Sequence, residues 1–458
     1  MAVMSIIKLS GLETGKRVDA EYYQPEFLKN KKFILNINLP KFSIKELSVY
    51  ITNGHTPYHA DLSKGEIPFL TAEDIFDFYI SFGTAKRITR EASQTELKRT
   101  ILHRNDLLVT IKGKIGNCAI IYKINKEINC NQDVARIVVK KGFNPYYIAA
   151  FLNSKFGKLQ INQLSTGQIN PFLGLKNLIK VTVPFIPKKE QQKIADLILE
   201  GLKNFESSLK FYSEAESYLL AELELKSFRP KPEKTYTANL SDVSNAHRID
   251  AEYFQPAYWT LVDKLNKYGS TPLLNSVESI PARFDPKSQS LKTFQYVELS
   301  NIASSVGTID SYSEVSGYEA PGRAKRVLKA NDVILSRVEG SLEKVALVYK
   351  EQEGYLASNG FFQFRSKDIL PEVLLVLAKS FVVQMQFEKQ TAGTILTSVS
   401  KDAPKKILIP KFNRHAQEEI ALLVQQSHEA RKKAKELLEI AKKTVEIAIE
   451  KYGKDVVN

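Results

Sequence analysis

The sequence contains little cysteine, histidine and tryptophan, and it has no long apolar run. Among 458 residues there are 2 cysteines, 6 histidines and 1 tryptophan. Two cysteines cannot form a disulfide framework, and they make a structural zinc site improbable. No apolar run approaches the ~18 residues of a membrane-spanning helix, and Met1–Ser10 lacks the pattern of a secretory signal. We therefore expect a cytoplasmic protein without disulfides, bound metal or membrane association.

Motifs for catalysis are missing as well. His55 and His59 have the spacing of zinc ligands, but they lie in a Gly/Pro loop and no Glu follows His55. The glycines around Lys112 and Lys114 do not have P-loop spacing. Asn170 begins a turn that has only one of the two prolines in the Asn/Asp-Pro-Pro-aromatic motif of amino-methyltransferases. We therefore predict a non-catalytic protein without a cofactor.

Positive charge, in contrast, is abundant. Lys and Arg number 65 against 51 Asp and Glu, which gives a formal net charge of +14. Charge of this size attracts polyanions, and nucleic acid is the favoured partner. Solubility alone and an anionic membrane surface are the alternatives, although no helix combines a polybasic face with bulky apolar anchors.

One stretch of the chain occurs twice. Residues 17–25 (RVDAEYYQP) return as residues 248–256 (RIDAEYFQP), and the wider windows 8–25 and 239–256 share 9 of 18 positions. An internal repeat is the first feature that a fold prediction must accommodate. Later landmarks also recur in order, including Asn105-Asp106 with Asn331-Asp332. The chain is therefore predicted to consist of two copies of one unit.

Each copy combines β-strands with helices. Short apolar runs bounded by turn residues predict strands over 67–70, 106–111, 118–122, 134–139 and 179–183. Helical spacing predicts helices over 26–39, 146–164, 188–228 and 415–452. The fold class is therefore α+β, with two mixed α/β domains joined by two long helices and related by an internal pseudo-twofold repeat.

The two longest predicted helices carry apolar seams at three- and four-residue steps. Such seams are typical of helices that pair in a coiled coil, and we expect these two to pair with each other in antiparallel orientation. Packing of each seam on its own globular unit is the alternative. The residues predicted to make the pairing are Ile198, Leu202, Phe205, Leu209, Leu219, Val424, Leu438 and Val445.

Basic and amide side chains concentrate in the loops where the two copies differ most. Lys and Arg supply phosphate contacts, and Arg, Asn and Gln can read base edges. The candidate DNA-binding residues are Asn53, Thr56, Lys86, Arg87, Arg90, Lys112, Lys114, Asn117, Gln168, Asn170, Arg283, Arg323, Lys325, Arg326, Arg337, Lys344 and Thr394.

The order of these features resembles the DNA specificity subunits of type I restriction–modification systems. Each copy has the Asp-Ala-Glu-Tyr-aromatic-Gln-Pro lead-in, an Asn-Asp-apolar-apolar strand before a glycine loop, a helix that ends in Thr-Gly or Ala-Gly, and a strand that runs into Val-Pro or Ile-Pro. A Gln-bearing start to a long helix follows. The second copy departs from the first where Asn413 replaces Pro187 before the long helix and where Pro171-Phe172 has no match.

The resemblance implies a division of the chain and a set of partners. Residues 1–187 and 239–413 would be target recognition domains that each read half of a bipartite sequence in double-stranded DNA. Residues 188–228 and 414–452 would be spacer helices, with a linker over 229–238, and would dock methyltransferase subunits. ATP-dependent restriction subunits would join through the complex. The repeated stretch, being the same in both copies, would hold each unit on the helices or contact the methyltransferase.

Two other functions remain open at this level. The chain could serve a methylation-only system or a fused restriction–methylation enzyme. It could also be a coiled-coil scaffold protein whose basic charge is incidental.

Overall fold

The structure is a computed structural model, and it describes residues 7, 12, 17–57, 65–83, 85–167, 169–230, 233–392 and 398–453. The chain divides into two compact units. Unit 1 consists of Met1–Phe205 and Lys432–Asn458, and unit 2 consists of Glu206–Arg431. Each unit combines helices with β-sheets, which confirms the mixed α+β class. Within the described ranges, every helix is too short or too polar to span a membrane.

In unit 1, a series of short helices and strands precedes the first long helix. Its helical segments are η1 (Ala20–Tyr23), α2 (Pro25–Asn36), α3 (Ile44–Leu47), η2 (Ala72–Asp74), α4 (Arg90–Gln94), η3 (Lys98–Thr100), α5 (Pro145–Asn153), α6 (Lys155–Leu164) and α7 (Leu175–Leu178). Its strands are β1 (Lys41–Ser43), β2 (Ser48–Asn53), β3 (Ile67–Leu70), β4 (Lys86–Ile88), β5 (Leu107–Thr110), β6 (Cys118–Ile120), β7 (Asn129–Cys130), β8 (Val134–Val139) and β9 (Thr182–Pro184).

The main sheet of unit 1 has four antiparallel strands in the order β2-β8-β5-β6. Its side chains alternate between two cores, as the pleat of a strand requires. Leu107 and Val109 pack with the α5 side chains, whereas Leu108 packs with Leu70 on the other face. A smaller sheet follows the order β4-β3-β7, in which β3 and β7 are parallel. Burial on both faces explains why β5 and β8 are apolar runs instead of alternating ones.

Unit 2 contains a similar set of elements. Its helical segments are α9 (Leu240–Ala246), α10 (Pro256–Lys267), α11 (Leu273–Ser276), η4 (Pro286–Gln289), η5 (Leu299–Asn301), η6 (Lys350–Gln352), α12 (Pro371–Lys379), α13 (Phe381–Lys389) and η7 (Ala403–Lys406). Its strands are β10 (Ser270–Pro272), β11 (Val277–Ser279), β12 (Thr293–Val297), β13 (Ile302–Ala303), β14 (Thr308–Ile309), β15 (Ser313–Ser316), β16 (Ala324–Val327), β17 (Asp332–Ser336), β18 (Val345–Leu347), β19 (Leu356–Ser358), β20 (Phe361–Ser366), β21 (Thr391–Ala392), β22 (Ser398–Val399) and β23 (Leu408–Pro410).

The main sheet of unit 2 has four antiparallel strands in the order β11-β20-β17-β18. Val333 and Leu335 pack with the α12 side chains, and Ile334 packs on the opposite face. A second sheet follows the order β15-β12-β19-β16, in which β12 and β19 are parallel. In both main sheets the strand that comes first in the sequence lies at one edge. The last, the second and the third strand in the sequence follow it across the sheet.

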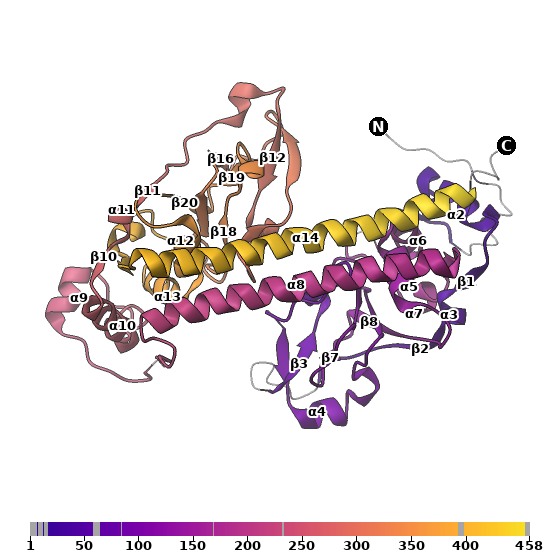
Figure 1. Ribbon diagram of the computed structural model, residues 1–458, viewed down its shortest axis with the longest axis horizontal. Coiled ribbons are helices and arrows are strands. Elements are labelled where there is room, and N and C mark those ends of the chain that lie inside the picture. The colour runs from indigo at the N-terminus through magenta and orange to yellow at the C-terminus, as the bar shows by residue number, and fades with distance from the viewer. Residues whose placement is uncertain are drawn as a thin grey trace. The chain divides into compact units, whose positions relative to one another are not determined.

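Two long helices, α8 (Lys188–Glu222) and α14 (Arg414–Gly453), are each divided between the units. In unit 1 the first part of α8 lies beside the second part of α14, and Glu200 pairs with Lys433 at 2.9 Å (Figure 1). In unit 2 the Ser427 hydroxyl donates to the Ser208 carbonyl at 2.7 Å. Also in unit 1, the Tyr452 hydroxyl donates to Glu190 Oε1 at 3.3 Å, so residue numbers fall along α14 as they rise along α8 and these two segments are antiparallel.

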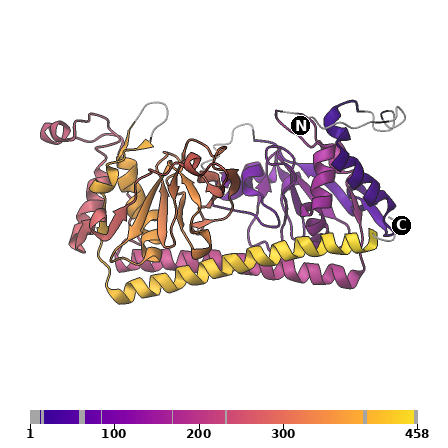
Figure 2. The same cartoon turned by 90° about the horizontal axis from the view of Figure 1, so that it is seen from above.

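The predicted pairing residues lie on the inner sides of these helices. Ile198, Leu202, Phe205, Leu219, Val424, Leu438 and Val445 are buried, and Leu209 is half-buried. Gly201 allows a close approach of the two segments in unit 1, because a Cβ added there would lie 2.9 Å from Leu438 Cγ. Seen unit by unit, the strands lie to one side of the helix segments that belong to the same unit (Figure 2).

The structure corrects two predicted helices. The helix expected over 146–164 is split into α5 and α6 at Ser154, which has extended φ and ψ values of −71° and 164°. Its hydroxyl accepts from Gly157 N–H and donates to Phe151 O, so it caps both helices. Helix α8 ends at Glu222 instead of 228, because Glu224 takes a left-handed φ of 52° and Leu225 N–H reaches Leu220 O. That pattern is a Schellman C-cap.

A buried histidine makes the stability of unit 2 depend on pH. His428 Nε2 donates to Val306 O at 2.6 Å, and Nδ1 accepts from the Tyr349 hydroxyl. Burial lowers the pKa of His428 to about 4. The positive charges of Lys379 and Arg431 act in the same direction, whereas the bond to Val306 and the charge of Asp310 oppose the shift. The unfolded chain therefore binds the proton first as the pH falls below ~6.5.

We expect this proton uptake to destabilise the fold between pH ~6.5 and 4, by up to about 3 kcal/mol. The free energy of unfolding, measured by urea titration at several pH values, should fall through this window and fall less in His428→Gln. His415→Gln, at an exposed position at the start of α14, is the control and should keep the wild-type slope. Equal slopes for wild type and His428→Gln would contradict the prediction.

Candidate nucleic-acid interface

Two loops of unit 1 meet at the end of strand β5. One follows β5 directly and contains Lys112 and Lys114, and the other follows α6 and contains Asn170. A backbone bridge joins Lys112 to Phe172, and Leu173 N–H donates to Ile111 O at 2.9 Å. All three predicted side chains are exposed. The structure thus brings Lys112, Lys114 and Asn170 together on one edge of the unit.

Apolar side chains at this edge were missed by the sequence prediction. Ile169 is 92% exposed and Phe172 is 44% exposed. The loops adjoin a hollow of about 600 Å³, whose lining includes Gly113, Thr166 and Arg17. An apolar residue inside a Gly/Pro loop is the signal that could have marked Ile169. Exposed apolar groups beside lysines suit a surface that contacts both bases and phosphates.

Three of the predicted amide and hydroxyl groups of unit 1 are engaged within the unit. Asn53 Nδ2 donates to Gln132 O at 3.0 Å, and the Thr56 hydroxyl donates to Gln132 Oε1 at 3.1 Å. Asn117 Nδ2 donates to Ile75 O at 3.0 Å. These bonds hold one loop to another, so a role in base reading would require them to be exchanged.

The remaining predicted cations of unit 1 lie on and beside strand β4, and not in a loop as expected. Lys86, Arg87 and Arg90 are exposed. Arg90 Nε pairs with Glu66 Oε1 at 2.8 Å, and Arg87 Nη1 donates to Glu66 O at 3.2 Å. The side-chain bond to Glu66 raises the pKa of Arg90. Glu66 thus orients two of the three cations at the outer sheet.

In unit 2, three predicted arginines gather around the turn that follows β19. Asn359 N–H donates to Arg323 O at 2.7 Å, and Arg337 N–H donates to Gly360 O at 2.8 Å. Arg326 lies in β16, which pairs with β19. Arg323 is exposed and Arg337 is half-buried. Arg326 is only 6% exposed, which corrects the expectation of a loop-tip side chain.

The other candidates of unit 2 are more dispersed. Lys325 Nζ pairs with Asp285 at 3.2 Å, Lys344 Nζ donates to Ile302 O at 3.3 Å, and Arg283 is exposed. Gln168 of unit 1 and Thr394 of unit 2 lie outside the described residues. DNA contact by any of these side chains stays a prediction.

The repeated sequence stretch forms the same structure in both units. Arg17 Nε donates to Asp19 at 2.8 Å, its Nη2 donates to Ser165 O at 3.0 Å beyond α6, and its guanidinium lies over Tyr22. Arg248 donates to Asp250 at 2.7 Å and to the last residue of α13 at 3.3 Å. The bond from Arg17 lowers the pKa of Asp19.

A cation at a helix C-terminus satisfies free carbonyls and favours the helix dipole. The described contacts of the two arginines therefore close α6 and α13. The expectation that the stretch holds each unit on the long helices or contacts the methyltransferase stays a prediction.

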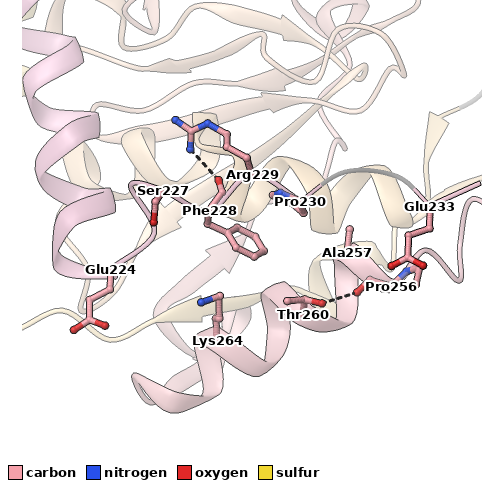
Figure 3. Close-up of a pocket in the computed structure, with 10 residues that line it drawn as sticks. All are labelled: Glu224, Ser227, Phe228, Arg229, Pro230, Glu233, Pro256, Ala257, Thr260 and Lys264. Carbon is pink, nitrogen blue, oxygen red and sulfur yellow. Dashed lines mark hydrogen bonds between the residues drawn. The ribbon is translucent and has the colours of Figure 1, made fainter.

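Unit 2 contains an open hollow of about 340 Å³ (Figure 3). Its lining includes Glu224, Arg229 and Lys264, but the Thr260 hydroxyl donates to Pro256 O and Arg229 donates to Phe228 O. Burial raises the pKa of Cys130 to about 12, so that thiol is unreactive. Among the described residues, no group of three His, Cys, Asp or Glu side chains could hold a metal ion.

A family model matches one part of the chain. Residues 36–210 match the family model of the type I restriction modification DNA specificity domain. This part of the chain is therefore similar to that family, in agreement with the resemblance seen in the sequence.

Two curated relatives are similar to a segment of the chain. The type I restriction enzyme MjaIX specificity subunit of Methanocaldococcus jannaschii is 27% identical over 135 residues, which are 29% of this chain and 31% of the relative. The EcoBI specificity subunit of Escherichia coli is 31% identical over 134 residues, which are 29% of this chain and 27% of the relative. The matched segment thus spans less than a third of either relative.

Two solved structures are also similar over most of the chain. The type I restriction–modification S subunit from M. genitalium covers 90% of this chain and 96% of its own, with 14% identity and a TM-score of 0.44. The HsdS subunit from Thermoanaerobacter tengcongensis covers the same shares with 13% identity and a TM-score of 0.30.

Proposed function

We propose that the chain is the DNA specificity subunit of a type I restriction–modification complex. Each unit reads one half of a bipartite target in double-stranded DNA. The observation that carries the proposal is the family match of residues 36–210, together with a four-stranded sheet of the same order in unit 2.

The difference between the units supports two separate half-sites. Their main sheets share one order, but the glycine loop of unit 1 carries exposed Lys112 and Lys114, whereas that of unit 2 begins at the half-buried Arg337. A protein that reads two unlike half-sites must differ where it contacts the bases. The shared sheets are then the frame, and the loops carry the specificity.

The long helices are proposed to set the distance between half-sites and to dock methyltransferase subunits. Apolar side chains exposed on α14 support a docked partner, because such groups are usually covered in an assembly. They are Leu422, Ile440 and Ile447, which are 49%, 49% and 66% exposed. Recognition domains over 1–187 and 239–413, and spacer helices over 188–228 and 414–452, remain the proposed division.

In this proposal the chain itself is non-catalytic and binds no cofactor. Methyl transfer and ATP-dependent cleavage belong to the methyltransferase and restriction subunits that would join it in the cytoplasm. The hollow beside Glu224 adds little support for another view, because the side chains of Arg229 and Thr260 in its lining donate to neighbouring backbone.

A methylation-only or fused restriction–methylation system would use the same DNA-reading surface. An adjacent gene for an ATP-driven nuclease favours the type I complex, and its absence favours the alternative. A coiled-coil scaffold with incidental charge would show no sequence preference at all.

The proposal is tested by measuring binding of the chain, with its methyltransferase partner, to a library of duplexes. We expect enrichment of one motif with two specified halves and an unspecified gap. Replacement of residues 1–187 by those of another specificity subunit should change one half only. Binding without preference for any bipartite duplex over random DNA would refute the proposal, and a change in both halves would refute independent reading.

A further inference from the structure

Unit 2 contains two arginines that have no counter-charge among its described residues. Arg326 is 6% exposed and donates from Nη1 to Ile280 O at 2.6 Å. Arg337 donates from Nη2 to Val399 O at 3.0 Å, and its guanidinium lies 5.0 Å from the centre of the Phe362 ring. Neither forms an ion pair with a carboxylate of the described residues. The Nε–H groups of both are buried and have no hydrogen-bond partner there.

The two cations are close enough to affect each other. Burial and the charge of Arg337 lower the pKa of Arg326 to about 10, and burial lowers the pKa of Arg337 as well. A buried cation without a partner is unfavourable, and proteins avoid it unless an anion is supplied. The free protein therefore carries a positive site that an acidic ligand would complete.

The frame of the unit does not require these cations. In unit 2, Val399 N–H donates to Arg337 O, and in unit 1 the matching bond runs from Leu173 N–H to Ile111 O. Ile111 therefore occupies in unit 1 the position that Arg337 occupies in unit 2. Leu102 of unit 1 and Leu328 of unit 2 also make matching backbone bonds, to Ile128 O and Tyr355 O. Thr100, two positions before Leu102, therefore matches Arg326, two positions before Leu328. The same sheet thus forms in unit 1 with a hydroxyl and an aliphatic group in place of the arginines.

The site adjoins the segments in which the copies differ. The β16–β19 pairing is irregular between Ala324 and Arg326, and irregular pairings often re-aim side chains next to functional sites. Arg337 begins the glycine loop, and exposed Arg323 joins the same turn through Asn359. A guanidinium offers a planar pair of donors that fits a phosphate group.

We propose that Arg326 and Arg337 form a phosphate site in unit 2 that receives one backbone phosphate of bound DNA. The inference rests on the proposed function and adds a phosphate contact that unit 1 does not make at the matching positions. A site of this kind fixes the register of unit 2 on its half-site without reading a base. A free phosphate ion has the same chemistry, so the test must separate the two sources.

The test uses the full chain with its methyltransferase partner and the variants Arg326→Met and Arg337→Gln. Duplex affinity is measured against salt concentration. Loss of one phosphate contact should reduce the slope of log K against log salt by about 0.9. Arg414→Met, which removes an exposed arginine paired with Glu418 on α14, is the matched control and should leave the slope unchanged.

Thermal unfolding with and without inorganic phosphate supplies the second readout. Arg326→Met should unfold at the wild-type temperature or above it, because an unpaired buried charge is removed. Unfolding several degrees earlier would show that Arg326 has a structural role and would overturn the inference. An unchanged DNA slope, with phosphate stabilising only the wild type, would assign the site to small anions and would also overturn it.

Failure of the proposed function gives a different result. In that case the wild type itself shows no preference for a bipartite duplex. If the wild type shows the preference but the slopes of wild type and both arginine variants agree, only the phosphate site is refuted.

Discussion

Replacing Asp332 by alanine is expected to lower the free energy of unfolding of unit 2 by roughly 3–5 kcal/mol. The Asp332 carboxylate is fully buried and accepts from Arg365 Nε at 2.9 Å, Gln363 Nε2 at 2.7 Å and Lys329 N–H at 2.9 Å. Alanine would leave Arg365 Nε and Lys329 N–H without their acceptor and Gln363 Nε2 with only its bond to Val327 O. Removal of one partner from a buried ionic network costs far more than the intact network contributes.

The measurement is urea unfolding of the full chain, followed by a probe in unit 2 such as the single tryptophan, Trp259. Asp285→Ala is the control, because Asp285 also pairs with a cation, Lys325, but is exposed. Its unfolding midpoint should match that of the wild type. A shift for Asp332→Ala no larger than for Asp285→Ala would show that the buried network does not stabilise the unit.

Asp106 plays the same part in unit 1. It is 2% exposed and accepts from Arg136 Nε at 2.6 Å and from His103 N–H at 2.7 Å. The preceding residues, Asn105 and Asn331, both have a left-handed φ, of 72° and 68°, a conformation that asparagine tolerates well. The repeated Asn-Asp pair is therefore explained by the frame: the first residue turns the chain and the second anchors the sheet.

The strands were accessible from the sequence where their apolar runs are bounded by turn residues. The predicted strands at Ile67–Leu70 and Val134–Val139 have the observed limits. The two failures have local causes that a single sequence conceals. Ser154 is one serine within a helical pattern, yet it caps two helices at once. Glu224 ends α8 in a left-handed conformation for which glycine is the usual signal.

The candidate site was less accessible, because the fate of a charged side chain depends on distant residues. Arg90 looks like a free cation until Glu66, 24 positions earlier, is placed beside it. Asn117 looks like a base reader until its amide is found on Ile75 O. Sequence could select the basic segments, but tertiary contacts decide which side chains stay available to DNA.

The glycine loop of unit 1 is the place where these contacts leave the cations available. Lys112 and Lys114 are both exposed, and neither has an ion-pair partner among the described residues. The double variant Lys112→Glu/Lys114→Glu is therefore expected to weaken duplex binding by on the order of 10–100-fold at low salt. Loss of two phosphate contacts should also reduce the salt slope by about 1.8.

Fluorescence anisotropy of a labelled bipartite duplex, titrated at several salt concentrations, measures both quantities. Lys140→Glu/Lys141→Glu is the matched control, since it reverses two exposed lysines in the turn after β8 of the same unit. This control changes the net charge equally, so a general electrostatic effect would appear in both variants. A salt slope that differs from the wild type only in Lys112→Glu/Lys114→Glu places the glycine loop on the DNA, and equal slopes in both variants would remove it from the interface.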